Sequence, residues 1–471
     1  ATATGPRGHV EDMPQLLDDQ AMWDFIADGY TVVHADFPSE FHAQIHRDTE
    51  AVFAERGNVG NGILAAVPEL AEVFEHSAVS GALTSVLGPG YRAYPHRHCH
   101  LNAPQSAAQA MHLDSYEADE NNRHHRARWA MAFYYPHDID DSMGPTSVVP
   151  RAQYHSTRPS NDEACFTGAA GSVCIVHYDS WHRATANLSD VPRYMHKWLF
   201  IRTAEPAEPS WDHSESSDPD CPATADLDSH DHRGMWASLW NWHCGGVDEG
   251  HGDGAEVADL CVALSDDAET VRLNAAYALG RVGERAVAPL VDALRDEADR
   301  RLDGNLAASM TNPSHLYAGY ALSAVGAPAV PALTDALESD SWAVRAAAAN
   351  TLGDIGRSAA DAVPALAQRL DDEEPWVRRN AAEALGHLGV EHGVGALGQL
   401  LTDEVEWVRL NAAVALTRIG PRAVAALPQL VAALGDEAYY VRANAAHALD
   451  AIGAQPAHDA LTAYLAACSD Y

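Results

Sequence analysis

The chain has 471 residues, 47% of them hydrophobic, and a formal net charge of −37 at pH 7. Such a charge repels DNA, RNA and anionic membranes, so binding to nucleic acid or to a membrane is not expected. Seven cysteines without a CxxC pair argue against a zinc ribbon or a disulfide scaffold. No apolar run reaches about 18 residues, and the start lacks the apolar core of a signal peptide. We therefore expect a cytoplasmic protein without a transmembrane helix.

Residues 1–205 predict a β-rich domain with two helices, at 20–29 and 38–55. Short runs rich in β-branched or aromatic residues are bounded there by Gly, Pro, Asp or Asn. Such runs are typical of strands in an all-β sandwich or barrel. They lie at 30–37, 94–102, 127–135, 146–150, 172–178 and 194–202.

Residues 206–249 predict a connector. Up to residue 232 the chain is rich in Pro, Ser and Asp, which is typical of irregular structure. The run 233-RGMWASLWNWHCGG-246 then predicts a short helix that carries Trp236, Trp240 and Trp242. We interpret these tryptophans as residues that pack two domains together. Alternatively, they form an aromatic wall of a substrate site.

Residues 250–471 repeat one pattern about six times, as in 377-VRRNAAEALGHLG-389 and 408-VRLNAAVALTRIG-420. The closing glycines lie 30 to 33 residues apart, except for a gap of 43 between Gly283 and Gly326. Each unit predicts two helices, the first ended by a left-handed glycine. One unit cannot bury its own apolar face, so the units should stack into a solenoid. This part resembles the HEAT-like repeats of the phycobilisome-lyase type, with an inserted loop at 299–313.

Two further positions recur in these repeats. An arginine follows a valine in each, and we expect it to pair with acidic residues such as Asp403; examples are Arg378, Arg409 and Arg442. An aromatic residue stands nearby, and we favour packing over a ladder that meets a partner; these residues are Trp342, Trp376, Trp407 and Tyr440.

The stretch 109-QAMHLDSY-116 holds a His-x-Asp pair, His112 and Asp114. On a strand the two side chains would point to the same face, but a lone pair of this kind is a weak signal. A third candidate ligand is His182, and Arg193 follows eleven residues later. Two histidines and one carboxylate form the facial triad suited to non-haem Fe(II), with open coordination positions. Arginine offers a planar fork for the carboxylate of a 2-oxo acid.

The order HLD, GPTSVVP and WHRATANLSDVPR resembles the phytanoyl-CoA dioxygenase family of Fe(II)- and 2-oxoglutarate-dependent oxygenases, over residues 20–203. The resemblance implies a multidomain α and β chain: an N-terminal double-stranded β-helix, or jelly roll, with flanking helices, then the all-α HEAT-like solenoid. It implies that iron binds to His112, Asp114 and His182, and that Arg193 binds the distal carboxylate of 2-oxoglutarate. Gln109 and Thr146 match further co-substrate contacts of the family, and Asn102 is a weaker candidate.

The chain departs from the family at two places. The run 150-PRAQYH-155 replaces Pro-Gly-Ser-His, and Ala184 stands where a small hydroxyl residue is common, with Thr185 next. Halogenating relatives lack the carboxylate, so Asp114 favours hydroxylation, desaturation or another oxidation. We expect oxidation of a small molecule by dioxygen, with succinate and CO2 as co-products; a natural-product intermediate is one candidate substrate.

Other functions stay open. The same triad would suit a zinc hydrolase, although Arg193 argues against it. The solenoid would alternatively bind a protein partner, recruit a protein-bound substrate, build a dimer, or serve as a scaffold beside a vestigial metal site.

Two polar stretches remain. His96, His98 and His100 share one face of a strand, as a second metal site or, as we favour, as the lining of a cavity. The stretch 119–128 is either a solvated loop or a lid that reads an anionic substrate through Arg123, Arg126 or Arg128.

Overall fold

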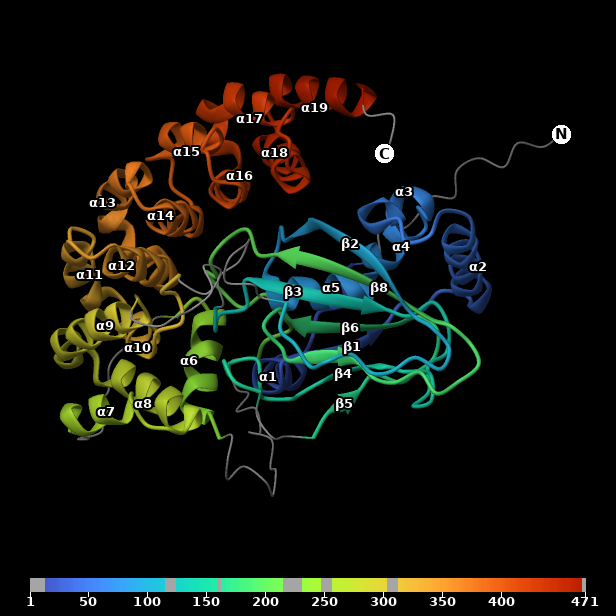
Figure 1. Ribbon diagram of the computed structural model, residues 1–471, viewed down its shortest axis with the longest axis horizontal. Helices are drawn as coiled ribbons and strands as arrows, with labels where there is room; N and C mark the ends of the chain where they lie inside the picture. Colours follow the sequence, from blue (N-terminus) through green and yellow to red (C-terminus); the bar gives the residue numbers. More distant parts are fainter. Residues whose placement is uncertain are drawn as a thin grey trace.

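The computed structural model describes residues 13–114, 124–158, 162–214, 231–246, 256–302 and 312–467. In these ranges an arc of helices curves around a β-sandwich (Figure 1). No helix within them is long and apolar enough to cross a membrane. The five cysteines that lie in them are all free, as their scattered spacing predicted.

The sandwich consists of two antiparallel sheets. Its strands are β1 (Tyr30–His34), β2 (Arg92–Asn102), β3 (Trp129–Tyr134), β4 (Thr146–Val148), β5 (Ala164–Cys165), β6 (Ser172–His177), β7 (His182–Ala184) and β8 (Arg193–Ile201). The larger sheet has the order β1-β6-β3-β8-β2, and the smaller has the order β5-β4-β7. This arrangement is the jelly roll that the family resemblance implied, and each of the short β-branched or aromatic runs contains a strand.

The larger sheet is buried on both faces, because helices cover the side that turns away from the smaller sheet. Alternate residues of β3 therefore enter two cores: Ala130 and Ala132 face the helices, while Met131 and Phe133 face the sandwich interior. The covering helices are α1 (Asp19–Asp28), α2 (Ser39–Arg56), α3 (Ile63–Ala66), α4 (Leu70–Glu75) and α5 (Ser77–Leu87). The sequence predicted α1 and α2 but missed α3 to α5.

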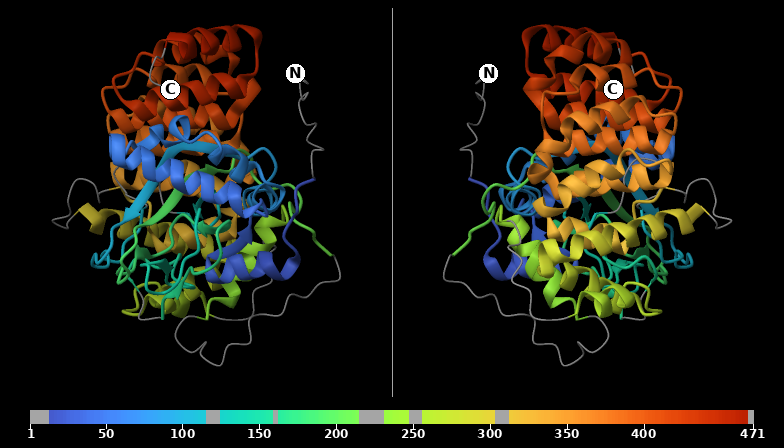
Figure 2. Two further views of the ribbon diagram at one scale, coloured as in Figure 1. Left: turned by 90° about the vertical axis from the view of Figure 1, so that its right-hand side faces the viewer. Right: turned by 90° about the vertical axis from the view of Figure 1, so that its left-hand side faces the viewer.

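The C-terminal part is a succession of helix pairs that begins at the lower left of Figure 1 and ends at its top. Its helices are α7 (Val257–Ala263), α8 (Glu269–Val282), α9 (Val287–Leu302), α10 (Tyr317–Val325), α11 (Val330–Ala336), α12 (Trp342–Ile355), α13 (Val363–Gln368), α14 (Pro375–Leu388), α15 (Val394–Leu400), α16 (Glu406–Ile419), α17 (Leu427–Ala433), α18 (Tyr439–Ile452) and α19 (Gln455–Ala467). The even-numbered helices α8 to α18 form the inner row (Figure 1), and the repeats stack in sequence order (Figure 2). The closing glycines have positive φ, as predicted; they are Gly283, Gly326, Gly356, Gly389, Gly420 and Gly453.

A ladder of ion pairs joins successive repeats. The guanidinium of an arginine in one repeat binds both carboxylate oxygens of an aspartate that precedes the next repeat's inner helix. The pairs are Arg345–Asp372, Arg378–Asp403 and Arg409–Asp436, with N–O distances of 2.7 to 3.1 Å. The expected pairing with an acidic residue is therefore confirmed for Arg378 and Arg409, whereas Arg442 donates to the backbone carbonyl oxygens of Asp436 and Glu437 at 2.6 and 2.9 Å.

The recurring aromatic residues divide into two kinds of contact. Trp376 and Trp407 stack on each other with ring centroids 4.2 Å apart, which is the packing that the sequence favoured. Tyr440 instead meets the sandwich, where its hydroxyl lies 2.9 Å from His96 Nδ1.

Helix α6 (Arg233–His243) joins the two parts. Trp236 is fully buried, and Trp240 makes an edge contact with Trp23 of α1 at 5.5 Å between centroids. Trp242 donates its Nε1–H to Glu205 at 3.0 Å. These tryptophans therefore hold two parts of the chain together by packing and hydrogen bonding, which is the interpretation that the sequence favoured.

The concave face of the solenoid is occupied by the sandwich. Leu410 and Val414 of α16 and Val441 of α18 belong to the same apolar core as Trp129 and Met131 of β3. The inner helices thus complete the core of the sandwich at one end. The sequence suggested that the concave surface binds a partner, but at α16 and α18 the β-sandwich of the same chain covers this surface.

A buried group of charges lies at the centre of this contact, and we name it the interface ion cluster: His124, Arg128, Glu205, Asp354 and Glu383. His124 Nδ1 lies 2.7 Å from Asp354, and its Nε2 lies 3.4 Å from Glu383. Arg128 binds Asp354 and, at 3.0 Å, Glu205. Each of these five side chains is less than a tenth exposed.

The cluster places two of the suspected lid arginines. Arg128 is buried against the solenoid, and Arg126 lies over the ring of Trp242, 5.5 Å from its centroid. Neither therefore reads a substrate at the mouth of the sandwich. Arg123 lies outside the described residues.

The interface ion cluster predicts a strong effect for Asp354→Asn. The change leaves His124 and Arg128 buried without their shared carboxylate, which should cost about 3–5 kcal/mol of unfolding free energy. Urea denaturation measures this loss of unfolding free energy. Asp361→Asn, which changes an exposed aspartate nearby, is the control. An equal midpoint for the two variants would contradict the role of the cluster.

The cluster also predicts a loss of stability at alkaline pH. Although burial opposes protonation, Asp354 and Glu383 raise the pKa of His124 to about 9. A folded-state pKa above the unfolded value stabilises the protein fully below about pH 6.5, and this contribution disappears as the pH rises through 9. We expect the melting temperature of the wild type to fall between pH 7 and 9 more steeply than that of His124→Gln. If the melting temperatures of the two proteins fell in parallel between pH 7 and 9, this role of His124 would be refuted.

Candidate metal centre

The three predicted ligands meet at the smaller sheet. His112 pairs with His182 of β7 as an antiparallel bridge, with two backbone N–O distances of 3.0 Å. Asp114 then faces both rings: its Oδ1 lies 3.8 Å from His112 Nε2, and its Oδ2 lies 3.3 Å from His182 Nε2. The chain at His112 forms a single bridge and not the strand that we expected, yet the bridge brings the ligands together.

The orientation of the two imidazoles suits a metal ion. His112 Nδ1 lies 2.9 Å from the carbonyl oxygen of Ala110, and His182 Nδ1 lies 3.0 Å from that of Ser180. A carbonyl can only accept a hydrogen bond, so each Nδ1 carries the proton. In each ring Nε2, which faces the carboxylate, is therefore the nitrogen that remains to bind a metal ion, as in metal sites where a backbone carbonyl holds Nδ1.

The electrostatics of the site keep the ligands in the forms that bind metal. Although burial raises the pKa of Asp114, the Lys197 ammonium and His182 outweigh it and hold this pKa well below its usual range. Burial lowers the pKa of His112, which keeps its imidazole neutral.

Lys197 is the site residue that the sequence analysis missed. It is the only lysine in the chain, it is buried, and its ammonium binds Asp114 Oδ2. A signal was present: Lys197 lies four residues after Arg193 on β8, so both point to the same face of the strand.

Arg193 is held by hydrogen bonds through two of its guanidinium nitrogens, while the third is available to a ligand. Its Nε and Nη2 donate to the carbonyl oxygen of Gly144, at 3.1 and 2.8 Å. Its Nη1 is buried and has no hydrogen-bond partner in the described ranges, and the same is true of Thr146 Oγ1. Both residues line one cavity of about 220 Å³ together with the triad. A carboxylate bound in this cavity would satisfy two costly orphan donors.

The Gly144 turn depends on having no side chain. Its φ is +70°, and an added Cβ would lie 2.2 Å from Asn102 Nδ2. Asn102 donates to the carbonyl oxygens of Gly144 and Thr185, both at 3.0 Å. Asn102 thus holds the turn, while its contact with a co-substrate stays a prediction.

Gln109 also lines the cavity. Its Oε1 accepts a hydrogen bond from the backbone N–H of Ala184 at 3.0 Å, which fixes the amide beside β7 and leaves its NH2 as the donor toward a ligand. The Thr185 hydroxyl donates to the carbonyl oxygen of Pro145 at 2.9 Å and so does not replace the hydroxyl that Ala184 lacks.

The three histidines of β2 lie along one row. The rings of His96 and His98 stack at 4.3 Å, and His98 and His100 lie 6.4 Å apart. Burial and the Lys197 charge lower the pKa of His100 to about 3, so it is neutral. His100 lines the metal-site cavity, as the cavity interpretation predicted, and the row does not form a metal-ligand group within the described residues.

A second group with metal-ligand atoms, His124, Glu383 and His387, lies at the interface. His124 is held protonated there by two carboxylates, and Arg379 binds Glu383 at 2.6 Å. A metal ion needs a neutral imidazole and an available carboxylate. We therefore assign His124 and Glu383 to the interface ion cluster, and the His387 ring packs beside His124, with centroids 5.3 Å apart.

Family models match the C-terminal part of the chain. HEAT repeats match residues 316–386 and 394–471, and the PBS lyase HEAT-like repeat matches residues 271–296 and 377–403. These segments are HEAT repeats, as the sequence pattern indicated. No curated protein sequence matches the chain.

Solved structures resemble part of the chain. One is the non-heme alpha ketoglutarate dependent carbocyclase SnoK from nogalamycin biosynthesis: 18% identity, TM-score 0.36, 41% of this chain and 88% of that chain. A second is AviO1 from Streptomyces viridochromogenes Tue57: 14% identity, TM-score 0.33, 38% and 93%. A third is HygX from Streptomyces hygroscopicus with nickel and 2-oxoglutarate bound: 14% identity, TM-score 0.32, 40% and 87%.

The geometry predicts one divalent metal ion per chain. Removing a ligand, as in Asp114→Ala or His182→Ala, should weaken affinity by more than about 100-fold, because loss of a supporting residue alone costs 10–100-fold. Titration with Co(II), followed by its visible spectrum, measures both stoichiometry and affinity.

Two controls sharpen this titration. His392→Ala, at an exposed position, should bind like the wild type, and so should His387→Ala. A stoichiometry of two that falls to one in His387→Ala would contradict our assignment of the interface group.

Proposed function

We propose that the chain is a non-haem Fe(II)- and 2-oxoglutarate-dependent oxygenase that oxidises a C–H bond of a small molecule. The catalytic part is residues 1–205, residues 206–249 connect it, and residues 250–471 form the frame that holds it. The observation that carries the proposal is the buried Arg193 Nη1, which has no partner in the described ranges and opens into the same cavity as His112, Asp114 and His182.

The donor set favours iron with an organic co-substrate over a hydrolytic metal. Two imidazoles and one carboxylate suit Fe(II) and leave open positions for other ligands. A zinc hydrolase needs only a water in such a position, and it would have no use for a buried arginine beside the ligands. The sequence resemblance to the phytanoyl-CoA dioxygenase family points the same way.

Each residue of the site has a defined task in this proposal. His112, Asp114 and His182 hold the metal ion, which when bound would supply dioxygen activation coupled to decarboxylation of 2-oxoglutarate to succinate and CO2. Arg193 binds the distal carboxylate of 2-oxoglutarate through its free Nη1.

The residues around these positions support them. Thr146 donates its hydroxyl to the carboxylate that Arg193 binds, and Gln109 offers its amide NH2 to the co-substrate. Gly144, held by Asn102, fixes the Arg193 guanidinium before the ligand arrives, so binding orders fewer groups. Lys197 holds Asp114 ionised and oriented.

An anaerobic titration with Fe(II) and then 2-oxoglutarate tests the proposal, followed by the metal-to-ligand charge-transfer band in the visible spectrum. Arg193→Gln should weaken 2-oxoglutarate binding by about 10- to 100-fold, since a charged hydrogen bond contributes about 1.5–3 kcal/mol. Fe(II) binding itself should be retained, because Arg193 is not a ligand.

Arg158→Gln is the matched control, because Arg158 is half-exposed and binds Glu163; it should bind 2-oxoglutarate like the wild type. Absence of the band in the wild type together with tight zinc binding would overturn the oxygenase and favour a hydrolase.

A further inference from the structure

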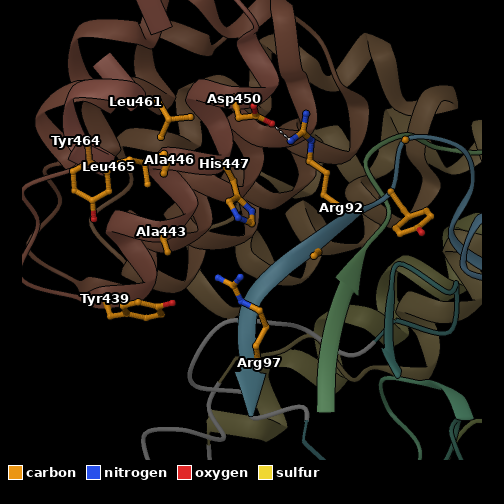
Figure 3. Close-up of a pocket in the computed structure, with 13 residues that line it drawn as sticks. Arg92, Arg97, Tyr439, Ala443, Ala446, His447, Asp450, Leu461, Tyr464 and Leu465 are labelled. Carbon is orange, nitrogen blue, oxygen red and sulfur yellow. Dashed lines mark hydrogen bonds and ion pairs between the residues drawn. The ribbon is translucent and has the colours of Figure 1, made fainter. Parts of the chain in front are cut away.

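A second and larger cavity lies where the edge strand β2 meets the last repeat, and its volume is about 670 Å³. It is built from two distant parts of the chain: residues 90–97 of β2 and its approach, and residues 439–465 of α18 and α19 (Figure 3). It shares no lining residue with the metal-site cavity. Its volume is in the range of about 300–1,000 Å³ that is typical of small-molecule sites.

The walls of this cavity are mostly apolar. The residues that supply them are Tyr91, Ala93, Ala443, Ala446, Leu461, Tyr464 and Leu465. Leu465 is half exposed, so the cavity opens to solvent beside α19. The small alanines of α18 leave the space that larger side chains would fill.

Two arginines enter the cavity from β2, and they differ in their partners. Arg92 forms an ion pair with Asp450 (Figure 3), so its charge is compensated. The guanidinium of Arg97 points from β2 toward α18, near Tyr439 and His447 (Figure 3). Arg97 Nε is buried and has no hydrogen-bond partner in the described ranges, and no carboxylate there pairs with this guanidinium. Its guanidinium also lies over the Trp198 ring, with Cζ 5.9 Å from the ring centroid, a contact that leaves its charge uncompensated. In a chain with a net charge of −37, such an arginine is an available anion site.

His447 adds a second polar group at the same place. Its Nδ1 is buried and has no hydrogen-bond partner in the described ranges. Burial, with Arg97 and Arg92 nearby, lowers the pKa of His447 to about 4. The imidazole is therefore neutral, and Arg97 carries the only uncompensated charge among the lining residues.

We propose that this cavity binds an organic monoanion: a carboxylate held by Arg97, joined to an apolar body that lies between α18 and α19. One uncompensated positive charge matches one negative charge, whereas a phosphate dianion would leave an excess charge beside Asp450. The bound molecule would contact the sandwich and the last repeat at once. This site is independent of the proposed oxygenase activity.

Decanoate is the probe for this site, and isothermal titration calorimetry of the full chain without added metal or 2-oxoglutarate measures its binding. We expect one decanoate per chain and a rise in melting temperature. Arg97→Met should weaken binding at least about tenfold, because a charged hydrogen bond is lost. Arg285→Gln, which removes an exposed arginine of the solenoid, should change nothing.

Further ligands and variants separate the charge from the apolar body. Decanol and decyl phosphate should bind more weakly than decanoate to the wild type. Asp450→Asn frees Arg92 and should reverse the preference toward decyl phosphate, while Ala446→Phe fills the cavity and should abolish binding of all three. Equal binding of decanol and decanoate, or equal affinity of wild type and Arg97→Met, would overturn the proposal, as would no decanoate binding to the wild type.

Discussion

His124 and Arg128 extend from the sandwich into the concave face of the solenoid, where Asp354 and Glu383 receive them. Buried charges of this kind are tolerated only when their partners are present and well oriented. Asp354 and Glu383 lie more than 200 residues away from His124 and Arg128 in sequence. The segment that carries His124 and Arg128 can therefore be buried only when the repeats are packed correctly against the sandwich. The cluster therefore defines one position of the sandwich against α12 and α14.

Apolar packing acts in the same place. Leu410, Val414 and Val441 enter the core of the sandwich, and Arg418 lies over the ring of Trp129 at 5.9 Å. Repeat arrays commonly present their concave face to another protein, and here the inner helices hold the chain's own β-sandwich. The array behaves as an intramolecular clamp, so a further protein partner would have to use other surfaces of the repeats.

The sequence was sufficient for those features that follow a local pattern. Short β-branched and aromatic runs predicted a β-sandwich or barrel, and the family resemblance implied a jelly roll. The repeat period and the glycine helix ends predicted the solenoid, and the order of His112, Asp114, His182 and Arg193 predicted residues that the fold brings together. Contacts between distant segments have no local pattern, so the burial of Arg128 against Asp354 was out of reach. Lys197 was within reach, since its spacing from Arg193 on one strand indicated a shared face.

The shared core has a consequence for biosynthesis. The sandwich is complete in sequence at Ile201, the end of β8, but Val441 closes its apolar end only after the repeats have been made. At about 5–20 residues per second, the interval is roughly 10 to 50 s. During that time Trp129 lacks the Arg418 guanidinium over its ring, and Tyr94 and His96 of the edge strand β2 lack their contacts with Tyr440. The nascent chain is therefore at greatest risk of aggregation in the middle of its own synthesis, and any chaperone that assists it would have to act there.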